Sequence, residues 1–200
     1  MSSDCPSFST SDCHLEVPIT DAETKPALRW FVMRDLKRVN AILPAYKLLS
    51  DLHFEVFTPM KWELKVEKGK RVRKEVPVMQ DLLFVHAENN ILDPVVKKNK
   101  TLQYRYVKGG AYCEPMTVRE EDMRRFMKAV DSSENPVYYR PEELTAAMCG
   151  RKIRIIGGPL DNFEGSLLTV RGSKVKRLLV ELPDLLTVGV EVNPEYIQLI

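Results

Sequence analysis

Residues 151–165, with the sequence RKIRIIGGPLDNFEG, contain the pattern that decides the fold of the C-terminal part of the chain. The first six of these residues alternate basic and apolar side chains, which predicts a half-buried β-strand. Residues 157–159, Gly-Gly-Pro, predict a tight turn, because glycine accepts a positive φ and proline restricts its own φ. Phe163 then returns to apolar surroundings, and Gly165 permits a second bend before the next predicted strand. The pattern indicates a compact antiparallel β-structure.

The composition is typical of a globular protein that folds in water. Hydrophobic residues make up 44% of the 200 residues, and the formal net charge is only +2. No apolar run approaches the roughly 18 residues that a membrane-spanning helix needs. The first 24 residues lack the basic start and apolar core of a secretory signal, so we expect a cytoplasmic protein without a membrane partner.

The cysteines and histidines do not form a recognisable metal or catalytic motif. Cys5, Cys13, Cys113 and Cys149 are scattered and no CxxC pair occurs, which favours reduced thiols over disulfides or a zinc site. None of the three histidines stands in a nucleophile motif, and the Gly-Gly-Pro turn lacks the Lys-Ser/Thr of a phosphate-binding loop. We therefore expect no metal, no cofactor and no enzyme activity.

The order of hydrophobic patterns predicts two folded regions. Residues 1–27 are rich in Ser, Thr and Asp and predict a disordered tail. Residues 28–130 predict an α/β domain, residues 131–141 a polar linker with two prolines, and residues 142–200 a β-barrel. The predicted strands and helices of the α/β domain follow the order β-α-β-β-β-α-β-α.

Two local motifs within this domain are distinctive. Between residues 61 and 76, apolar and charged side chains alternate on both sides of Lys68-Gly69-Lys70, which predicts a charged hairpin. Residues 117–120, Thr-Val-Arg-Glu, match a capping box before the helical spacing of Met123, Phe126, Met127 and Val130. We expect a helix to begin there. An earlier helix is expected over residues 37–52, and because proline is unfavourable in a helix interior, it is expected to begin near Pro44 or to bend there.

The C-terminal pattern of strand, Gly-Gly-Pro turn, aromatic residue and glycine resembles the KOW motif of small SH3-like barrels that bind RNA or proteins. The two-domain order, taken with it, resembles the NusG family of transcription elongation factors over about residues 29–200. The matching segments are Arg29-Trp30-Phe31-Val32, Phe57-Thr58-Pro59, Gly69-Lys70-Arg71, Pro77, Phe84-Val85, Gly109-Gly110 and residues 158–165. The resemblance implies an α+β fold: an N-terminal NusG-like α/β sandwich with an antiparallel sheet, a linker and a KOW barrel.

One departure from the family pattern points to a subfamily. Most relatives carry Pro-Gly-Tyr or Pro-Asn-Tyr before the Phe-Val pair, whereas this chain has Gln80-Asp81-Leu82. That variant is similar to UpxY-type antiterminators of capsular polysaccharide operons.

The resemblance also implies an apolar patch that binds the clamp helices of the largest RNA polymerase subunit. The matching positions are Trp30, Met79, Leu82, Phe84, Tyr104 and Tyr106. A few large apolar groups desolvated against a partner are the usual basis of such an interface. The competing interpretation is that Leu82 and Phe84 belong to the protein core.

Two basic groups are candidates for binding non-template DNA or leader RNA. In the family, the end of the first strand lies near the non-template strand, which here places Arg34, Lys37 and Arg38 as candidates. The second group is Lys70, Arg71 and Arg73 in the predicted hairpin. Both patches suit phosphate contacts, and the alternative for each is a solvated surface.

The barrel is expected to offer a docking point for another protein. Leu185 and Leu186 are expected to lie exposed on a loop between barrel strands, and the same loop in relatives contacts Rho or a small-subunit ribosomal protein. Barrel core is the alternative for these two leucines. Leu160 and Phe163 complete the candidate set.

The function implied by the resemblance is a monomeric, specialised antiterminator that binds polymerase and suppresses pausing and termination, on an exopolysaccharide operon. Two alternatives remain open. One is a general elongation factor that couples polymerase to Rho or the ribosome, and the other is a ribosome-associated KOW protein that binds RNA.

Overall fold

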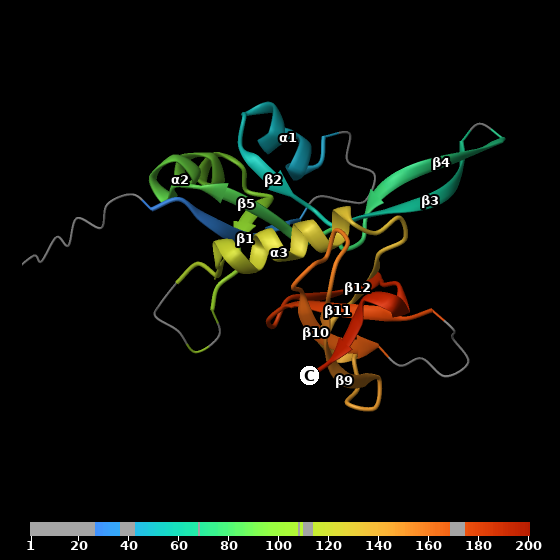
Figure 1. Ribbon diagram of the computed structural model, residues 1–200. Helices are drawn as coiled ribbons and strands as arrows, with labels where there is room; N and C mark the ends of the chain where they lie inside the picture. Colours follow the sequence, from blue (N-terminus) through green and yellow to red (C-terminus); the bar gives the residue numbers. More distant parts are fainter. Residues whose placement is uncertain (1–26, 37–42, 68, 108, 110–113, 169–174) are drawn as a thin grey trace, which may run out of the picture.

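The computed structural model describes residues 27–36, 43–67, 69–107, 109, 114–168 and 175–200 (Figure 1). The N-terminal part is built on a five-stranded antiparallel sheet with the strand order β2-β5-β1-β6, in which β7 also pairs with β1. Its elements are β1 (Arg29–Asp35), α1 (Ala45–Asp51), β2 (Glu55–Phe57), β5 (Leu83–Ala87), α2 (Asn89–Lys98), β6 (Leu102–Tyr104), β7 (Thr117–Val118) and α3 (Glu120–Asp131).

Helices cover both faces of this sheet. Because successive side chains of a strand point to opposite faces, β1 sends Phe31 and Met33 to one face and Trp30 and Val32 to the other. Phe31 and Met33 share a core with residues of α1 and α2, whereas Trp30 and Val32 share a core with residues of α3. In Figure 1 the sheet accordingly lies between the α1–α2 layer and α3. The predicted α/β sandwich is confirmed.

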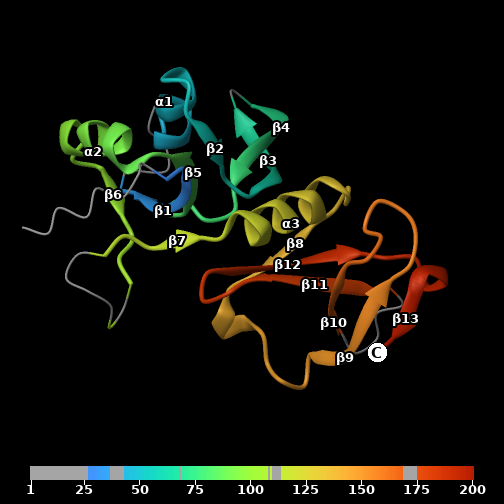
Figure 2. The same ribbon diagram turned by 60° about the vertical axis from the view of Figure 1, so that its left-hand side comes forward.

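The predicted hairpin is a two-stranded arm formed by β3 (Met60–Glu67) and β4 (Lys70–Pro77). Figures 1 and 2 show that this arm projects away from the sheet and from the C-terminal part. Gly69 has a φ of 77° in its turn, a value that L side chains adopt rarely. The arm therefore follows from its local sequence, alternation on both strands and a glycine between them.

The C-terminal part is a six-stranded sheet with the order β13-β9-β10-β11-β12-β8. Its elements are β8 (Val137–Tyr139), the 3-10 turn η1 (Pro141–Glu143), β9 (Cys149–Ile155), β10 (Glu164–Leu168), β11 (Arg177–Leu182), β12 (Leu186–Glu191), the 3-10 turn η2 (Pro194–Tyr196) and β13 (Ile197–Leu199). The interior is lined by alternate residues such as Ile153, Ile155, Leu178 and Val180, which are all buried. This strand-rich sheet is consistent with the predicted KOW barrel.

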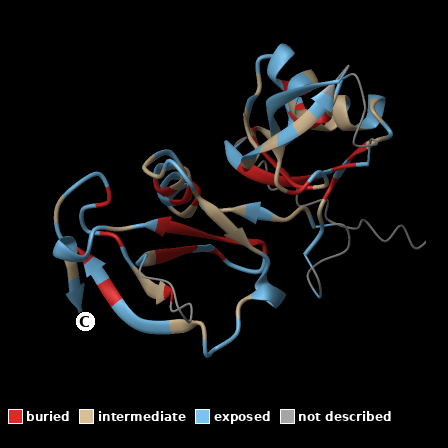
Figure 3. Ribbon diagram, turned by 90° about the vertical axis from the view of Figure 1, so that its right-hand side faces the viewer, coloured by how far each residue is buried: buried red, intermediate tan, exposed pale blue. Residues whose placement is uncertain are grey.

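Helix α3 lies between the N-terminal sheet and this second sheet (Figures 1 and 3). Its Phe126 meets Phe57 of the first sheet edge to face, with ring centroids 6.1 Å apart. On the other side, Arg125 and Lys128 each place their charge 5.4 Å from the ring centre of Phe163. As a result, buried residues of both parts form one continuous apolar cluster.

Two sequence expectations about local structure are wrong. Thr117 does not cap a helix, because residues 117–118 form β7 against β1, and α3 begins at Glu120 after Arg119. The segment expected to be a linker is partly structured as well, because Val137–Tyr139 pairs with β12 as β8. In contrast, α1 does begin directly after Pro44, as predicted.

Candidate functional site

The predicted apolar patch is not an exposed surface in this structure. Leu82 and Phe84 are 1% and 0% exposed, and Met79 is also buried, since α3 covers this face of the sheet. Tyr104 is buried in the opposite core, beside Phe31. The expectation that these side chains form an accessible patch is therefore wrong, and the competing core interpretation describes them.

Tyr106 is the exception among the six predicted positions. Its side chain is 50% exposed, and its backbone forms an isolated bridge with Pro115. Because β6 ends at Tyr104, Tyr106 lies beyond the regular sheet. It is the accessible apolar group of the predicted set.

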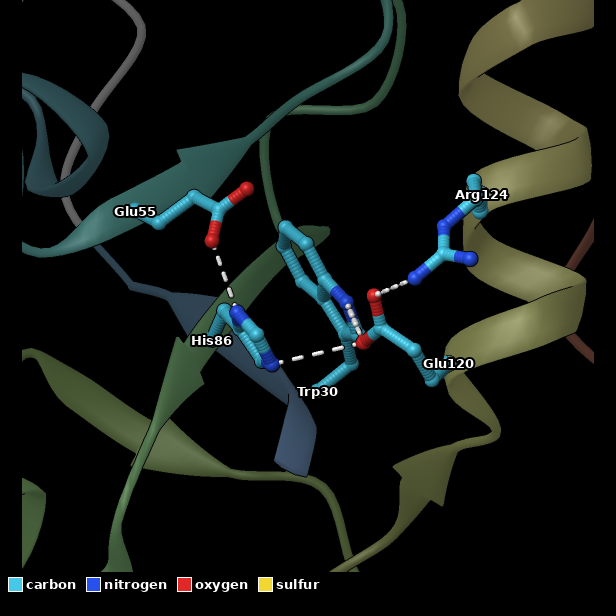
Figure 4. Close-up of polar contacts among 5 residues, drawn as sticks. All are labelled: Trp30, Glu55, His86, Glu120 and Arg124. Carbon is cyan, nitrogen blue, oxygen red and sulfur yellow. Dashed lines mark hydrogen bonds and ion pairs between the residues drawn. The ribbon is translucent and has the colours of Figure 1, made fainter. Parts of the chain in front are cut away.

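The buried indole of Trp30 belongs to a network of polar side chains (Figure 4). Its indole Nε1 donates a hydrogen bond of 2.8 Å to Oε2 of Glu120, at the first turn of α3. The indole also stacks on the His86 ring with an interplanar angle of 8° and a centroid distance of 4.7 Å. The buried indole thus has a partner for its donor, as a buried polar group requires.

His86 lies between two carboxylates in the same network. Its Nδ1 is 2.7 Å from Oε2 of Glu55, and its Nε2 is 3.3 Å from Oε2 of Glu120 (Figure 4). The imidazolium form can donate to both carboxylates at once, since both ring nitrogens then carry hydrogen. Glu120 also pairs with Arg124 at 3.1 Å. The network therefore joins β2, β5, β1 and the start of α3.

The first predicted basic group is only partly within the described residues. Arg34 is exposed at the end of β1, whereas Lys37 and Arg38 lie outside the described residues. The Arg34 guanidinium is 3.8 Å from Asp81, and Arg105 reaches the same carboxylate at 3.2 Å. Asp81 belongs to the Gln80-Asp81-Leu82 triplet that the sequence analysis singled out, a signal that could have pointed to this arginine pair.

The second basic group, Lys70, Arg71 and Arg73, is exposed along β4 of the arm. Arg73 places its guanidinium carbon 4.8 Å from the ring centre of Trp62 on the opposite strand. Neither arginine has an ion-pair partner within the part of the chain that the structure describes. The arm thus presents cations that can meet phosphates without first breaking an internal pair.

The four barrel candidates are all buried. Leu185 and Leu186 do not form an exposed loop tip, because the chain turns tightly at Asp184, whose φ is 60°, and Leu186 already pairs with Leu182 in the sheet. The expectation of exposed leucines is wrong. Leu160 and Phe163 are also buried, the latter beneath the cations of α3.

A polar pocket of about 340 Å³ lies between α3 and the barrel sheet. Its lining mixes both signs of charge, with Asp122, Glu164 and Glu181 against Arg125 and Lys152. Such a balanced lining does not favour one class of charged ligand. Among the described residues no group of acidic, histidine or cysteine side chains is placed to hold a metal ion, and no helix is long and apolar enough to cross a membrane.

Among the described residues, two tyrosines have raised pKa values. Burial is the main cause for both, because it disfavours the charged phenolate. The pKa of Tyr138 is raised to about 12, with smaller contributions from the charges of Asp131 and Glu75. The pKa of Tyr104 is raised further, since its hydroxyl also donates a 2.8 Å hydrogen bond to Asp93. Both phenols are neutral at physiological pH.

Comparison with known proteins gives one family match. The chain matches a family model described as NusG, transcription termination factor nusG, over residues 28–127. That span runs from the residue before β1 into α3 and includes the sheet, helices α1 and α2, and the arm. A comparison with curated proteins finds no match.

Among solved structures, the chain is similar to one described as domain interaction in Thermotoga maritima NusG. The two chains have a sequence identity of 13%, and their structures align with a TM-score of 0.43. The match covers 86% of this chain and 97% of that chain.

Proposed function

Because the chain belongs to the NusG family of transcription factors, we propose that it is a specialised antiterminator that binds the clamp helices of RNA polymerase and suppresses pausing and termination. The observation that carries this proposal is the family match over residues 28–127, which spans the sheet and its arm. In this mechanism no bond is made or broken. Binding shifts the polymerase toward conformers that continue elongation, by the difference in its affinity for the two states.

The fold supports a division into two functional regions. We propose that residues 28–130 bind polymerase and nucleic acid, and that the barrel strands from β8 onward bind a further partner, Rho or a small-subunit ribosomal protein. The burial of Phe163 beneath α3 bears on the second role. A partner that needs this ring must displace Arg125 and Lys128 first.

We propose Tyr106 as the polymerase contact, because the other five predicted positions are buried. Its ring is half exposed, whereas Leu82 and Phe84 support the sheet from inside. Tyr106→Ala is therefore expected to lower affinity for a clamp-helix fragment about tenfold, a typical loss for an interface hot spot. Tyr196→Ala in η2, whose side chain is 42% exposed, is a matched control, and an unchanged affinity for Tyr106→Ala would place the contact elsewhere.

A terminator template tests the proposed function directly. Purified polymerase transcribes through an intrinsic or Rho-dependent terminator with and without the protein, and the fraction of readthrough is measured. An antiterminator raises this fraction, whereas a general elongation factor changes the elongation rate while leaving or strengthening Rho-dependent termination. The proposal fails if the readthrough fraction does not rise at protein concentrations that saturate polymerase, and a changed elongation rate without added readthrough favours the general elongation factor.

The proposed target is an exopolysaccharide operon, selected by its leader. We propose that Arg34, with Lys37 and Arg38, reads this leader. The support from the described residues is that the Arg34 side chain stays exposed at the end of β1, next to the position of Lys37 and Arg38 in the sequence. Charge reversal at Lys37 and Arg38 is expected to abolish readthrough on the cognate leader while polymerase binding is retained. Loss of both together contradicts the separation of the two roles.

A further inference from the structure

One face of the β3–β4 arm carries an apolar stripe that the rest of the described chain does not cover. Trp62, Leu64 and Val66 are 55%, 74% and 70% exposed, and their spacing of two residues places them on the same face of β3. Three large apolar side chains in a row on a projecting arm are unusual, because single exposed apolar residues are common but contiguous patches usually mark a binding surface.

The same face also carries cations. Directly across the arm, Leu64 pairs with Arg73, Val66 pairs with Arg71 and Trp62 pairs with Glu75. The face therefore carries two arginines and one glutamate beside the stripe, and the arginines stand at its outer two positions. The arm as a whole has seven lysines and arginines against three glutamates between residues 60 and 77, a net charge of +4, whereas the entire chain has only +2. A polyanion with apolar groups of its own is complementary to this face.

We propose that this face binds an unpaired nucleic-acid strand, with its bases on Trp62, Leu64 and Val66 and its phosphates on Arg71 and Arg73. Stacking of bases on an aromatic ring beside a basic groove is the usual mode of single-strand binding. This inference deepens the nucleic-acid role already proposed for the arm cations, and rests on it.

The spacing of the stripe distinguishes an unpaired strand from a duplex. Alternate residues of a strand lie roughly 6.6 Å apart, about twice the 3.4 Å between stacked bases along one strand of a duplex. The stripe therefore fits bases that are separated from one another. A ribbon that reads a duplex does so with polar groups directed at base edges, which this face does not offer at its apolar positions.

The charge distribution also favours a nucleic acid over an acidic protein surface. Positive side chains continue on the opposite face of the arm at Lys65 and Lys70, which are in register with Val72 and Glu67. A flat protein partner covers one face only. A flexible phosphate chain passes around the edge of the arm and meets cations on both faces.

Oligonucleotide binding by the full chain tests this inference without polymerase. The probe is a fluorescein-labelled DNA of about 15 nucleotides, the upper range of one single-strand site, used unpaired and annealed to its complement. Trp62→Ala is expected to weaken binding of the unpaired probe about tenfold, the effect of losing one stacked base, and to change duplex binding less than twofold. Arg71→Gln with Arg73→Gln weakens both probes and flattens the salt dependence.

Tryptophan fluorescence gives a second readout that a merely structural role does not move. The chain has two tryptophans, of which Trp30 is buried and Trp62 is exposed, so an unpaired unlabelled DNA of the same length is expected to quench mainly Trp62. Trp62→Phe abolishes the quenching and keeps most of the affinity. Ile91→Ser on α2, which replaces a comparably exposed apolar residue, is the matched control and leaves both readouts unchanged.

Three results overturn the inference: no quenching by unpaired DNA, equal loss of unpaired and duplex binding in Trp62→Ala, or stripe variants that bind both probes normally but lose core polymerase. The last result makes the stripe a protein contact. If unpaired DNA binds as expected but readthrough on a terminator does not change, the proposed antitermination fails and the nucleic-acid site stands.

Discussion

Glu120 illustrates how much one side chain can decide at the scale of the residue. Its carboxylate accepts the indole hydrogen of Trp30, lies 3.3 Å from Nε2 of His86 and pairs with Arg124. In the sequence it looks like half of a capping box. The pattern could not reveal that Thr117 belongs to strand β7, which pairs with β1. Nor could it reveal that the Glu120 carboxylate accepts a hydrogen bond from Trp30, 90 positions earlier in the chain.

We expect Glu120→Ala to lower the free energy of unfolding by about 1–3 kcal/mol, because the buried Trp30 donor is left without its acceptor. Glu120→Gln keeps an acceptor for the indole and is expected to cost less. Urea unfolding followed by tryptophan fluorescence measures both. Equal stability of Glu120→Ala and the wild type contradicts the role given to this hydrogen bond, and Glu121→Ala on the exposed side of α3 is the control.

Tyr104 and Tyr138 give the fold a defined sensitivity to alkaline pH. Both have a pKa raised by burial above the ordinary value of about 10. The unfolded chain therefore loses these protons first, so the stabilisation is complete below pH of about 10 and is lost as pH rises through the folded-state pKa values.

The prediction is a free energy of unfolding that falls as pH rises above about 10, with a smaller slope in Tyr104→Phe. At neutral pH the same variant is expected to lose about 1 kcal/mol, because the hydrogen bond to Asp93 is removed. Denaturant titrations at neutral and alkaline pH test this. An unchanged slope in Tyr104→Phe assigns the alkaline loss to other groups.

At the scale of the element, sequence patterns predicted the helices and strands whose formation depends on neighbouring residues. The arm, the start of α1 after Pro44 and the helical spacing of α3 all follow from neighbouring residues, and the structure contains them. The candidate surfaces were less predictable. Alternation places Leu82 and Phe84 on one face, but only the packing of α3 decides that this face is buried. The same holds for Leu185 and Leu186, since the tight turn at Asp184 draws them into the barrel.

Gly165 tests the packing of the barrel strands. It lies on β10 opposite Ile153, and a Cβ there meets the backbone carbonyl of Leu179, which cannot move like the end of a side chain. We expect Gly165→Ala to destabilise the protein by about 1–3 kcal/mol, the usual cost of overpacking. Thermal unfolding measures the loss, and Ser166→Ala on the same strand is the control. A melting temperature equal to that of the wild type means that β10 can shift away from β11.

At the scale of the whole molecule, α3 controls access to the barrel. Arg125 and Lys128 cover the ring of Phe163, and each such contact contributes about 0.5–1 kcal/mol at a partly exposed site. Charge reversal of both residues is expected to loosen this interface. The readouts are a larger radius of gyration in solution scattering and faster proteolysis between α3 and β8, with Lys97→Glu on α2 as the control. Unchanged scattering and proteolysis contradict a role for the two cations in holding the interface.

The apolar cluster shared by both sheets has a thermodynamic consequence. Unfolding of either sheet exposes apolar surface on the other, so the two sheets are expected to unfold together. Differential scanning calorimetry should then record one endotherm rather than two. Severing the chain between them would leave each fragment prone to self-association, and adding the missing fragment back should restore solubility.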